Sequence, residues 1–105
     1  MSASNSLAHI FESNHLTRTN YKDWLRNLRI VLTLEKLDHV LDQKPIVLPN
    51  HPTIEKRAAY KKWMDENSRV KCYVLASMSN ELQCQHEHMH TARAMITHLQ
   101  KLYGE

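Results

Sequence analysis

Glycine is nearly missing from this chain, and that shortage limits the folds open to it. The 105 residues include a single glycine, Gly104, where average usage of about 7% predicts roughly seven. Loops that cradle phosphates need glycines, because their backbone must adopt positive φ and approach the ligand closely. A Walker loop and a dinucleotide-binding fingerprint are therefore excluded. Barrels and sandwiches of many strands also use glycine at tight turns, so the sequence favours a small helical domain.

Length and composition indicate one globular domain. The chain is long enough for one domain and too short for two ordinary ones. Hydrophobic residues make up 42% and charged residues 24%, which is typical of a folded protein rather than a disordered one. The formal net charge is +3, and the excess cations are spread along the chain. The sequence therefore lacks the basic block of a dedicated nucleic-acid arm.

The cellular setting follows from the N-terminus, the apolar runs and the cysteines. The first residues are polar and lack the apolar segment of a signal peptide. No apolar run approaches the roughly eighteen residues that a membrane span needs. Cys72 and Cys84 are accordingly expected as free thiols in a reducing compartment. The sequence predicts a soluble, cytoplasmic protein without a membrane partner.

The N-terminal third predicts a tail followed by a helix. Residues 1–13 are expected to form a flexible tail, and residues 11–16 to become ordered in an extended form against the core. Asn20 is a good N-cap, and apolar residues at helical spacing follow it. We expect a helix over about 21–35. A break near Lys36 should then lead to a short second helix or one further turn.

The rest of the chain predicts one long helix and two shorter helical segments. All three prolines lie between residues 45 and 52, which indicates an extended connector. Thr53 is the candidate N-cap of a helix from 54 to about 78. Ser79 can cap a short turn through Leu82.

The C-terminal helix completes the predicted fold. Thr91 should cap it, and Gly104 should follow it as the C′ residue. The predicted fold class is all-α: a compact bundle of four to five helices over residues 14–105.

The predicted core combines the apolar stripes of these helices. Trp24 and Trp63 occupy stripe positions, so both are expected as core anchors rather than surface residues. Cys72 is expected to be a buried, inert thiol. The predicted core consists of Tyr21, Trp24, Leu25, Leu28, Leu32, Tyr60, Trp63, Val70, Val74, Met78, Met95, Ile96, Leu99 and Tyr103.

One stretch carries candidate metal ligands. Cys84, His86, Glu87, His88 and His90 lie within seven residues, and all are side chains that zinc accepts. Their spacing does not match zinc-finger patterns, and on a helix only pairs four residues apart would share a face. We therefore expect a solvated polar connector and no metal or other cofactor.

The sequence offers no convincing catalytic constellation. Cys84 has histidine neighbours but no third orienting group and no glycine-shaped oxyanion site. Asp38, His39 and Asp42 are expected to form the polar side of a short helix. We therefore predict a protein that is not an enzyme, with no catalytic residue and no small-molecule substrate.

Cations gather at two places on the predicted helices. Lys22, Arg26 and Arg29 follow one another along the outer side of the first helix. A second group lies at the start of the long helix and consists of Lys56, Arg57, Lys61 and Lys62. A solvated helical face accounts for both groups. Weak, salt-sensitive RNA contact or charge steering between subunits is the functional alternative.

A family resemblance adds to this reading of the residues. In the first half it rests on Leu16-Thr17, Asn20-Tyr21, residues 24–32, Glu35-Lys36-Leu37 and Val40-Leu41. In the second half it rests on residues 60–63, residues 72–82, Gln85-His86-Glu87, Thr91-Ala92 and residues 99–104. Over about residues 14–104 the chain resembles the Gag polyprotein of plant copia-type long-terminal-repeat retrotransposons.

The resemblance implies a retroviral-capsid-like N-terminal lobe. Such a lobe is all-helical and self-associates into a virus-like particle shell around the element RNA, so the implied partners are other copies of the chain and RNA. We expect exposed helix faces to make the subunit contacts, with Arg26 and Arg29 as candidates. The family's RNA-binding zinc knuckle (C-x₂-C-x₄-H-x₄-C) does not occur in this sequence, which leaves RNA packaging by this chain in question.

Two other functions stay open from the sequence. The neuronal Arc protein is also derived from Gag, and its N-terminal capsid lobe binds short peptides in a groove. A similar adaptor groove here would lie between the first helix and the segment before it, lined by Phe11, Leu16, Tyr21 and Trp24. The second alternative is weak, non-specific RNA binding through the two cationic groups.

Overall fold

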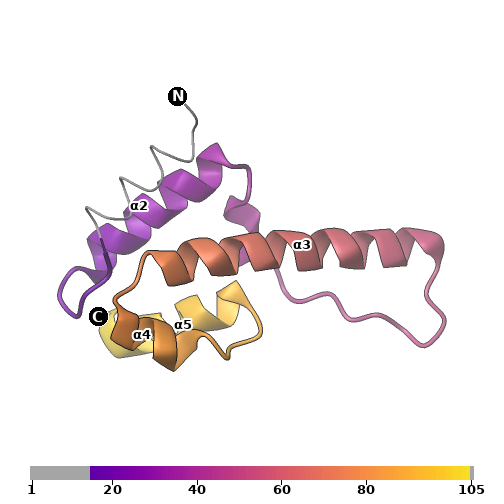
Figure 1. The fold of residues 1–105 in the computed structure, drawn as a ribbon. Coiled ribbons are helices and arrows are strands. Elements are labelled where there is room, and N and C mark those ends of the chain that lie inside the picture. The colour runs from indigo at the N-terminus through magenta and orange to yellow at the C-terminus, as the bar shows by residue number, and fades with distance from the viewer. Residues whose placement is uncertain (1–14, 105) are drawn as a thin grey trace.

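Five helical segments follow one another in the computed structural model, which describes residues 15–104 (Figure 1). They are α2 (Tyr21–Leu34), the 3₁₀ helix η1 (Asp38–Leu41), α3 (Ile54–Ala76), α4 (Asn80–His86) and α5 (Ala92–Tyr103). No β-strand occurs within this part of the chain, so the predicted all-α bundle is confirmed. The predicted tail, residues 1–13, lies outside the described residues.

Helix α2 buries one stripe and begins after a turn that Asn20 organises. Tyr21, Trp24 and Leu28 are among its buried residues. Asn20 stands at the N-cap position, as predicted, but its side chain does not cap the helix. Its Oδ1 instead accepts a hydrogen bond from the Thr17 backbone N–H at 2.8 Å, and its Nδ2 donates to the His15 carbonyl at 2.8 Å. The side chain therefore fixes the chain that enters the helix.

The predicted break after α2 occurs at Lys36. This residue has φ of 60°, the left-handed region that favours glycine. The Leu37 N–H bonds back to the Leu32 carbonyl at 2.7 Å, so the chain turns sharply. The turn leads into η1, which buries Val40 and Leu41 against the core.

Helix α3 extends well beyond the other helices at its N-terminal end (Figure 1). Thr53 caps it as predicted, since its side chain accepts from the Lys56 N–H at 3.1 Å. The core cluster takes no residue between 42 and 69, so only the second half of α3 packs into the bundle. The proline-containing loop returns beside the free half. We call residues 45–65, the loop and the first half of α3, the arm.

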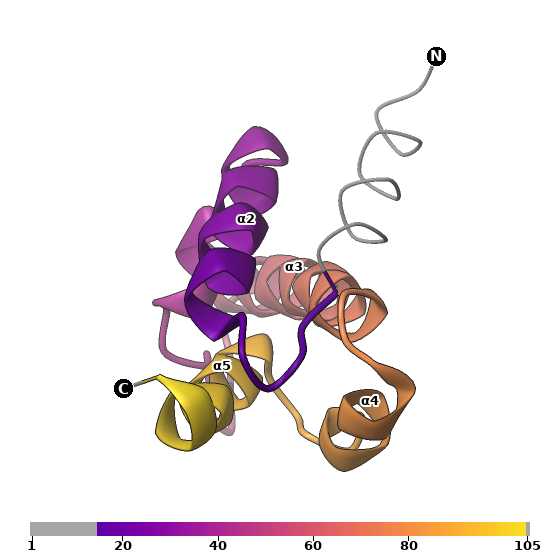
Figure 2. The same cartoon turned by 90° about the vertical axis from the view of Figure 1, so that its left-hand side faces the viewer.

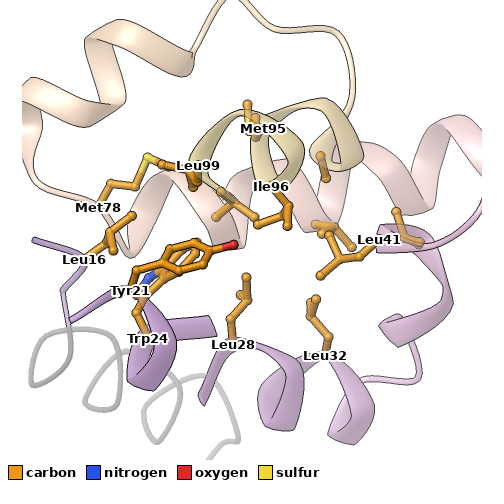
Figure 3. Close-up of a cluster of buried hydrophobic side chains, with 14 of the residues drawn as sticks. Leu16, Tyr21, Trp24, Leu28, Leu32, Leu41, Met78, Met95, Ile96 and Leu99 are labelled. Atoms are coloured by element: carbon orange, nitrogen blue, oxygen red, sulfur yellow. The ribbon is translucent and has the colours of Figure 1, made fainter. Parts of the chain in front are cut away.

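The hydrophobic core lies where α2, η1, α5 and the second half of α3 meet (Figures 2 and 3). Leu16 packs into this core from the segment before α2. Its side chain is fully buried, and its N–H donates to the Ser77 carbonyl at 2.8 Å. Trp24 is a core anchor, as predicted. Its indole N–H lies 3.1 Å from the Ser77 carbonyl and 3.0 Å from the Ser77 hydroxyl. The core therefore ties the chain before α2 to the end of α3.

Most of the predicted core residues are buried. Of the fourteen, Tyr60 and Trp63 lie outside the core cluster, and Leu25 and Tyr103 pack against it while partly exposed. Three polar residues that were not in the predicted core are also buried: Asn67, Ser77 and His86.

Asn67 joins α3 to the start of α5. Its Oδ1 accepts from the Ala92 N–H at 2.9 Å, and its Nδ2 donates to the His90 carbonyl at 3.1 Å. Thr91 then caps α5 by accepting from the Ala94 N–H at 3.0 Å, as predicted. Gly104 follows α5 with φ of −94°, so its backbone does not use the left-handed conformation expected of a C′ glycine.

A polar contact covers one side of the core between α2 and α3. The Tyr73 hydroxyl donates to Glu35 Oε1 at 2.9 Å, and the Arg69 guanidinium reaches the same oxygen at 3.5 Å. Burial, followed by the hydrogen bond and the negative charge of Glu35, raises the pKa of the Tyr73 phenol above its usual value. The phenol therefore stays a donor at neutral pH and holds the end of α2 against α3.

Candidate interaction surface

Arg26 and Arg29, the sequence candidates for subunit contacts, lie together on the outer side of α2. They line an open hollow of about 540 Å³. Its full lining is Lys22, Leu25, Arg26, Arg29, Ile30 and Thr33. Ile30 is 59% exposed, so the floor is apolar while its rim carries three cations. We call these six residues the α2 face.

The cations of the α2 face are only loosely held by acids of the same chain. Arg26 lies 3.2 Å from Asp23, one turn earlier on the helix, and both side chains are largely exposed. Arg29 reaches Asp42 at 3.7 Å. Exposed ion pairs of this kind typically contribute about 0–1 kcal/mol. The two guanidinium groups can therefore turn toward a partner at little cost.

The residues predicted to line a peptide groove lie elsewhere. Leu16, Tyr21 and Trp24 are at most 3% exposed and belong to the core cluster, and burial raises the pKa of the Tyr21 phenol. Phe11 lies outside the described residues. A peptide could reach the other three side chains only by opening the core. The structure therefore separates the predicted groove residues from the α2 face.

The arm presents a second exposed surface, whose cations the sequence indicated but whose exposed aromatic residues it did not. Tyr60 and Trp63 lie on it, only partly buried, with ring centroids 6.0 Å apart. Ile54 is 83% exposed and Met64 43% exposed. The nearby cations Lys56, Arg57, Lys61 and Lys62 were the available signal, because a helix segment with so many charges cannot bury itself on all sides.

The histidine-rich stretch is only partly a solvated connector. Helix α4 runs through His86, beyond the predicted turn ending at Leu82, and His86 is fully buried. Its Nδ1 bonds the Leu82 carbonyl at 2.8 Å, and its Nε2 lies 2.9 Å from His98 Nδ1. Both ring nitrogens are therefore engaged within the protein. Within residues 15–104, no three His, Cys, Asp or Glu side chains are grouped to hold a metal ion.

Both cysteines are free and exposed in the structure. The prediction of free thiols is confirmed for both, but Cys72 is exposed and is not the buried residue that the sequence indicated. It lies on the side of α3 that faces away from the core.

Comparisons of the chain with protein-family models, curated proteins and solved structures find no match. No helix in the described part of the chain is long and apolar enough to cross a membrane. The candidate surfaces are therefore interpreted from their own residues: two exposed faces that combine apolar and cationic side chains.

Proposed function

We propose that this chain is the N-terminal capsid lobe of a copia-type retrotransposon Gag protein, with other copies of itself as its partner. The lobe has a structural role and no catalytic one, and it assembles in the cytoplasm into a shell around the element RNA. The Gag-like sequence pattern and the helical bundle support this proposal. The observation that carries it is the α2 face, where the exposed Ile30 is bordered by Arg26 and Arg29.

The chemistry of the α2 face suits another protein surface. Its hollow is open and shallow, and a small molecule would stay largely in water there, whereas ligand pockets bury most of their ligand. An apolar floor with a charged rim resembles the usual anatomy of a protein interface. Contacts in a shell can be individually weak, because symmetry multiplies them.

Sedimentation velocity over roughly a hundredfold range of protein concentration tests the proposal. We expect the mass to rise with concentration and to stay the same when EDTA is added. Ile30→Glu should weaken this association by roughly tenfold or more, because it puts a charge on the apolar floor. Leu102→Glu is the matched control, since Leu102 is 49% exposed on α5, outside the α2 face. A strict monomer at every concentration would overturn the proposal.

Non-specific RNA binding is a second candidate, favoured by the three cations on the α2 face. Contacts with phosphates release counterions, so their affinity must fall steeply as salt rises. Titration of a fluorescent RNA at about 50 and 200 mM salt distinguishes this function. An affinity that does not change with salt would dismiss it.

A further inference from the structure

A fully buried histidine joins α4 to α5. His86 is 0% exposed, and its Nε2 lies 2.9 Å from Nδ1 of His98 on α5. This is the one hydrogen bond between the two helices in the part of the chain that the structure describes. Both helices lie on the same side of α3 (Figure 1). Helix α4 has only seven residues, too few to be stable alone, so its place depends on its contacts with the bundle.

The two rings differ in their access to water. A carbonyl can only accept, so His86 Nδ1 donates to the Leu82 carbonyl at 2.8 Å, and Nε2 of the neutral ring accepts from His98. Both nitrogens of His86 are then used within the protein. His98 is partly exposed and lines an open hollow of about 340 Å³. Its Nε2 has no hydrogen-bond partner within residues 15–104, so a proton can be added there from water.

The pair can bind one extra proton, but not a second one while the contact stays intact. The first proton goes to His98 Nε2, and His98 Nδ1 still donates to His86. A second proton would go to His86 Nε2 and set two N–H donors against each other at 2.9 Å. It would also place a charge on a ring that is 0% exposed. The second proton therefore requires the two rings to separate.

The charges of α5 and α3 near the pair oppose a second proton. Arg93 and Lys101 line the same hollow as His98, and no ion pair within residues 15–104 holds either cation. On α3, Lys71 stands four residues from Leu75, whose carbonyl accepts from the Gln83 side chain of α4. Residues four apart share a helix face, so Lys71 lies on the side toward α4. Three cations therefore disfavour further positive charge in the pair.

The remaining titratable groups around the pair do not offset these cations. From η1, which packs against α5, His39 and Asp42 are engaged with Glu66 and Arg29, and Asp38 is exposed. The groups on α4 and on the connector behind it are all exposed to water: Glu81, Cys84, Glu87, His88 and His90. None of these acids is recorded in a hydrogen bond or ion pair with either ring.

We propose that the His86–His98 contact is acid-sensitive: it holds α4 against α5 at neutral pH and opens when both rings are protonated. Below about pH 6.5 the unfolded chain binds a proton at each ring, whereas the native pair binds one. The stability that the contact supplies is therefore complete above this pH and is lost as the pH falls. The loss is about tenfold in the folding equilibrium constant for each pH unit. The inference does not depend on the proposed self-association.

Urea unfolding of the full chain in dilute solution, at about pH 7.5 and about pH 5, tests the proposal. The lower pH should shift the wild type toward the unfolded state by roughly tenfold or more. His86→Met is less stable at both pH values but should lose about tenfold of this pH effect, because only His98 then titrates in the pair. His88→Asn is the matched control. It removes an exposed histidine two residues further along and should keep the pH dependence of the wild type.

Ring nitrogen-15 chemical shifts of the wild type give a second measurement, which does not require His86→Met to fold. Over the same pH range, His98 should gain its proton while His86 stays neutral in the folded protein. A charged His86 ring in a protein whose amides over residues 80–86 keep their folded shifts would overturn the proposal. A pH dependence in His86→Met as large as that of the wild type would overturn it as well.

Discussion

Lys36 occupies a backbone conformation that suits glycine better than lysine. Its φ of 60° makes the sharp turn between α2 and η1, and residues with a Cβ pay roughly 1–2 kcal/mol in the left-handed region. Replacing Lys36 with glycine would relieve this strain. Part of the gain in stability would be lost, because glycine is more flexible in the unfolded chain. The chain's one glycine, Gly104, stands where φ is negative. The turn at Lys36 is therefore a point of backbone strain.

We predict that Lys36→Gly stabilises the protein by roughly 0.5–1 kcal/mol. Urea unfolding measures the change. The control is Arg26→Gly, an exposed position in the middle of α2, which should cost about 1 kcal/mol because glycine is a poor helix former. A loss of stability in Lys36→Gly would show that the lysine side chain contributes more than its backbone strain costs.

The buried His86 has a hydrogen-bonding pattern that fixes its tautomer. The Leu82 carbonyl can only accept, so His86 Nδ1 carries the proton and, in the neutral ring, Nε2 accepts. His98 Nδ1 must then donate across the 2.9 Å contact. Nitrogen-15 chemical shifts should accordingly show the neutral form of both rings as the Nδ1–H tautomer.

The same pair yields a stability prediction. His98→Asn keeps a donor in nearly the same place and should retain most of the stability. His98→Leu leaves buried His86 Nε2 without a donor and should cost roughly 1–3 kcal/mol. Urea unfolding compares the two variants. Equal losses would mean that packing, not the hydrogen bond, accounts for the role of His98.

At the scale of elements, helix starts were predictable and the extent of packing was not. Thr53, Ser79 and Thr91 cap their helices as expected, because a cap depends on the few residues that follow it. Trp63 was wrongly predicted to lie in the core, because its burial depends on how far the other helices reach along α3. The burial of His86 was not predicted for the same reason, since its hydrogen-bond partner His98 lies on another helix. For the candidate surfaces, the sequence identified Arg26 and Arg29 and the cations of the arm, but it placed Tyr60 and Trp63 in the core.

Two caps of the same chemistry should therefore differ in their effect on stability. Thr91 starts α5, which packs into the core, whereas Thr53 starts α3 on the arm. We predict that Thr91→Ala lowers the free energy of unfolding by about 1 kcal/mol. Thr53→Ala should cost less than half as much, because fraying there leaves the bundle intact. Urea unfolding of both variants checks this, and equal losses would show that the arm unfolds together with the core.

The whole molecule combines a packed bundle with an arm that the bundle does not cover. Local opening costs least where few apolar contacts hold a helix. In dilute protein, amides over residues 54–62 should therefore exchange with deuterium much faster than those over residues 92–99, which start and fill α5 in the core. If copies join through the α2 face, protection of residues 22–33 must rise with protein concentration while that of α5 stays constant.

Hydrogen exchange by mass spectrometry at two concentrations, roughly a hundredfold apart, separates these expectations. Wild type should gain protection over residues 22–33, and Ile30→Glu should not. If the arm is as protected as α5 even in dilute protein, the arm is covered within a single copy and needs no partner. If the gain falls on the arm instead, the copies meet at the arm and not at the α2 face. A gain in both places fits a lattice best, because an extended shell needs more than one kind of contact on each subunit.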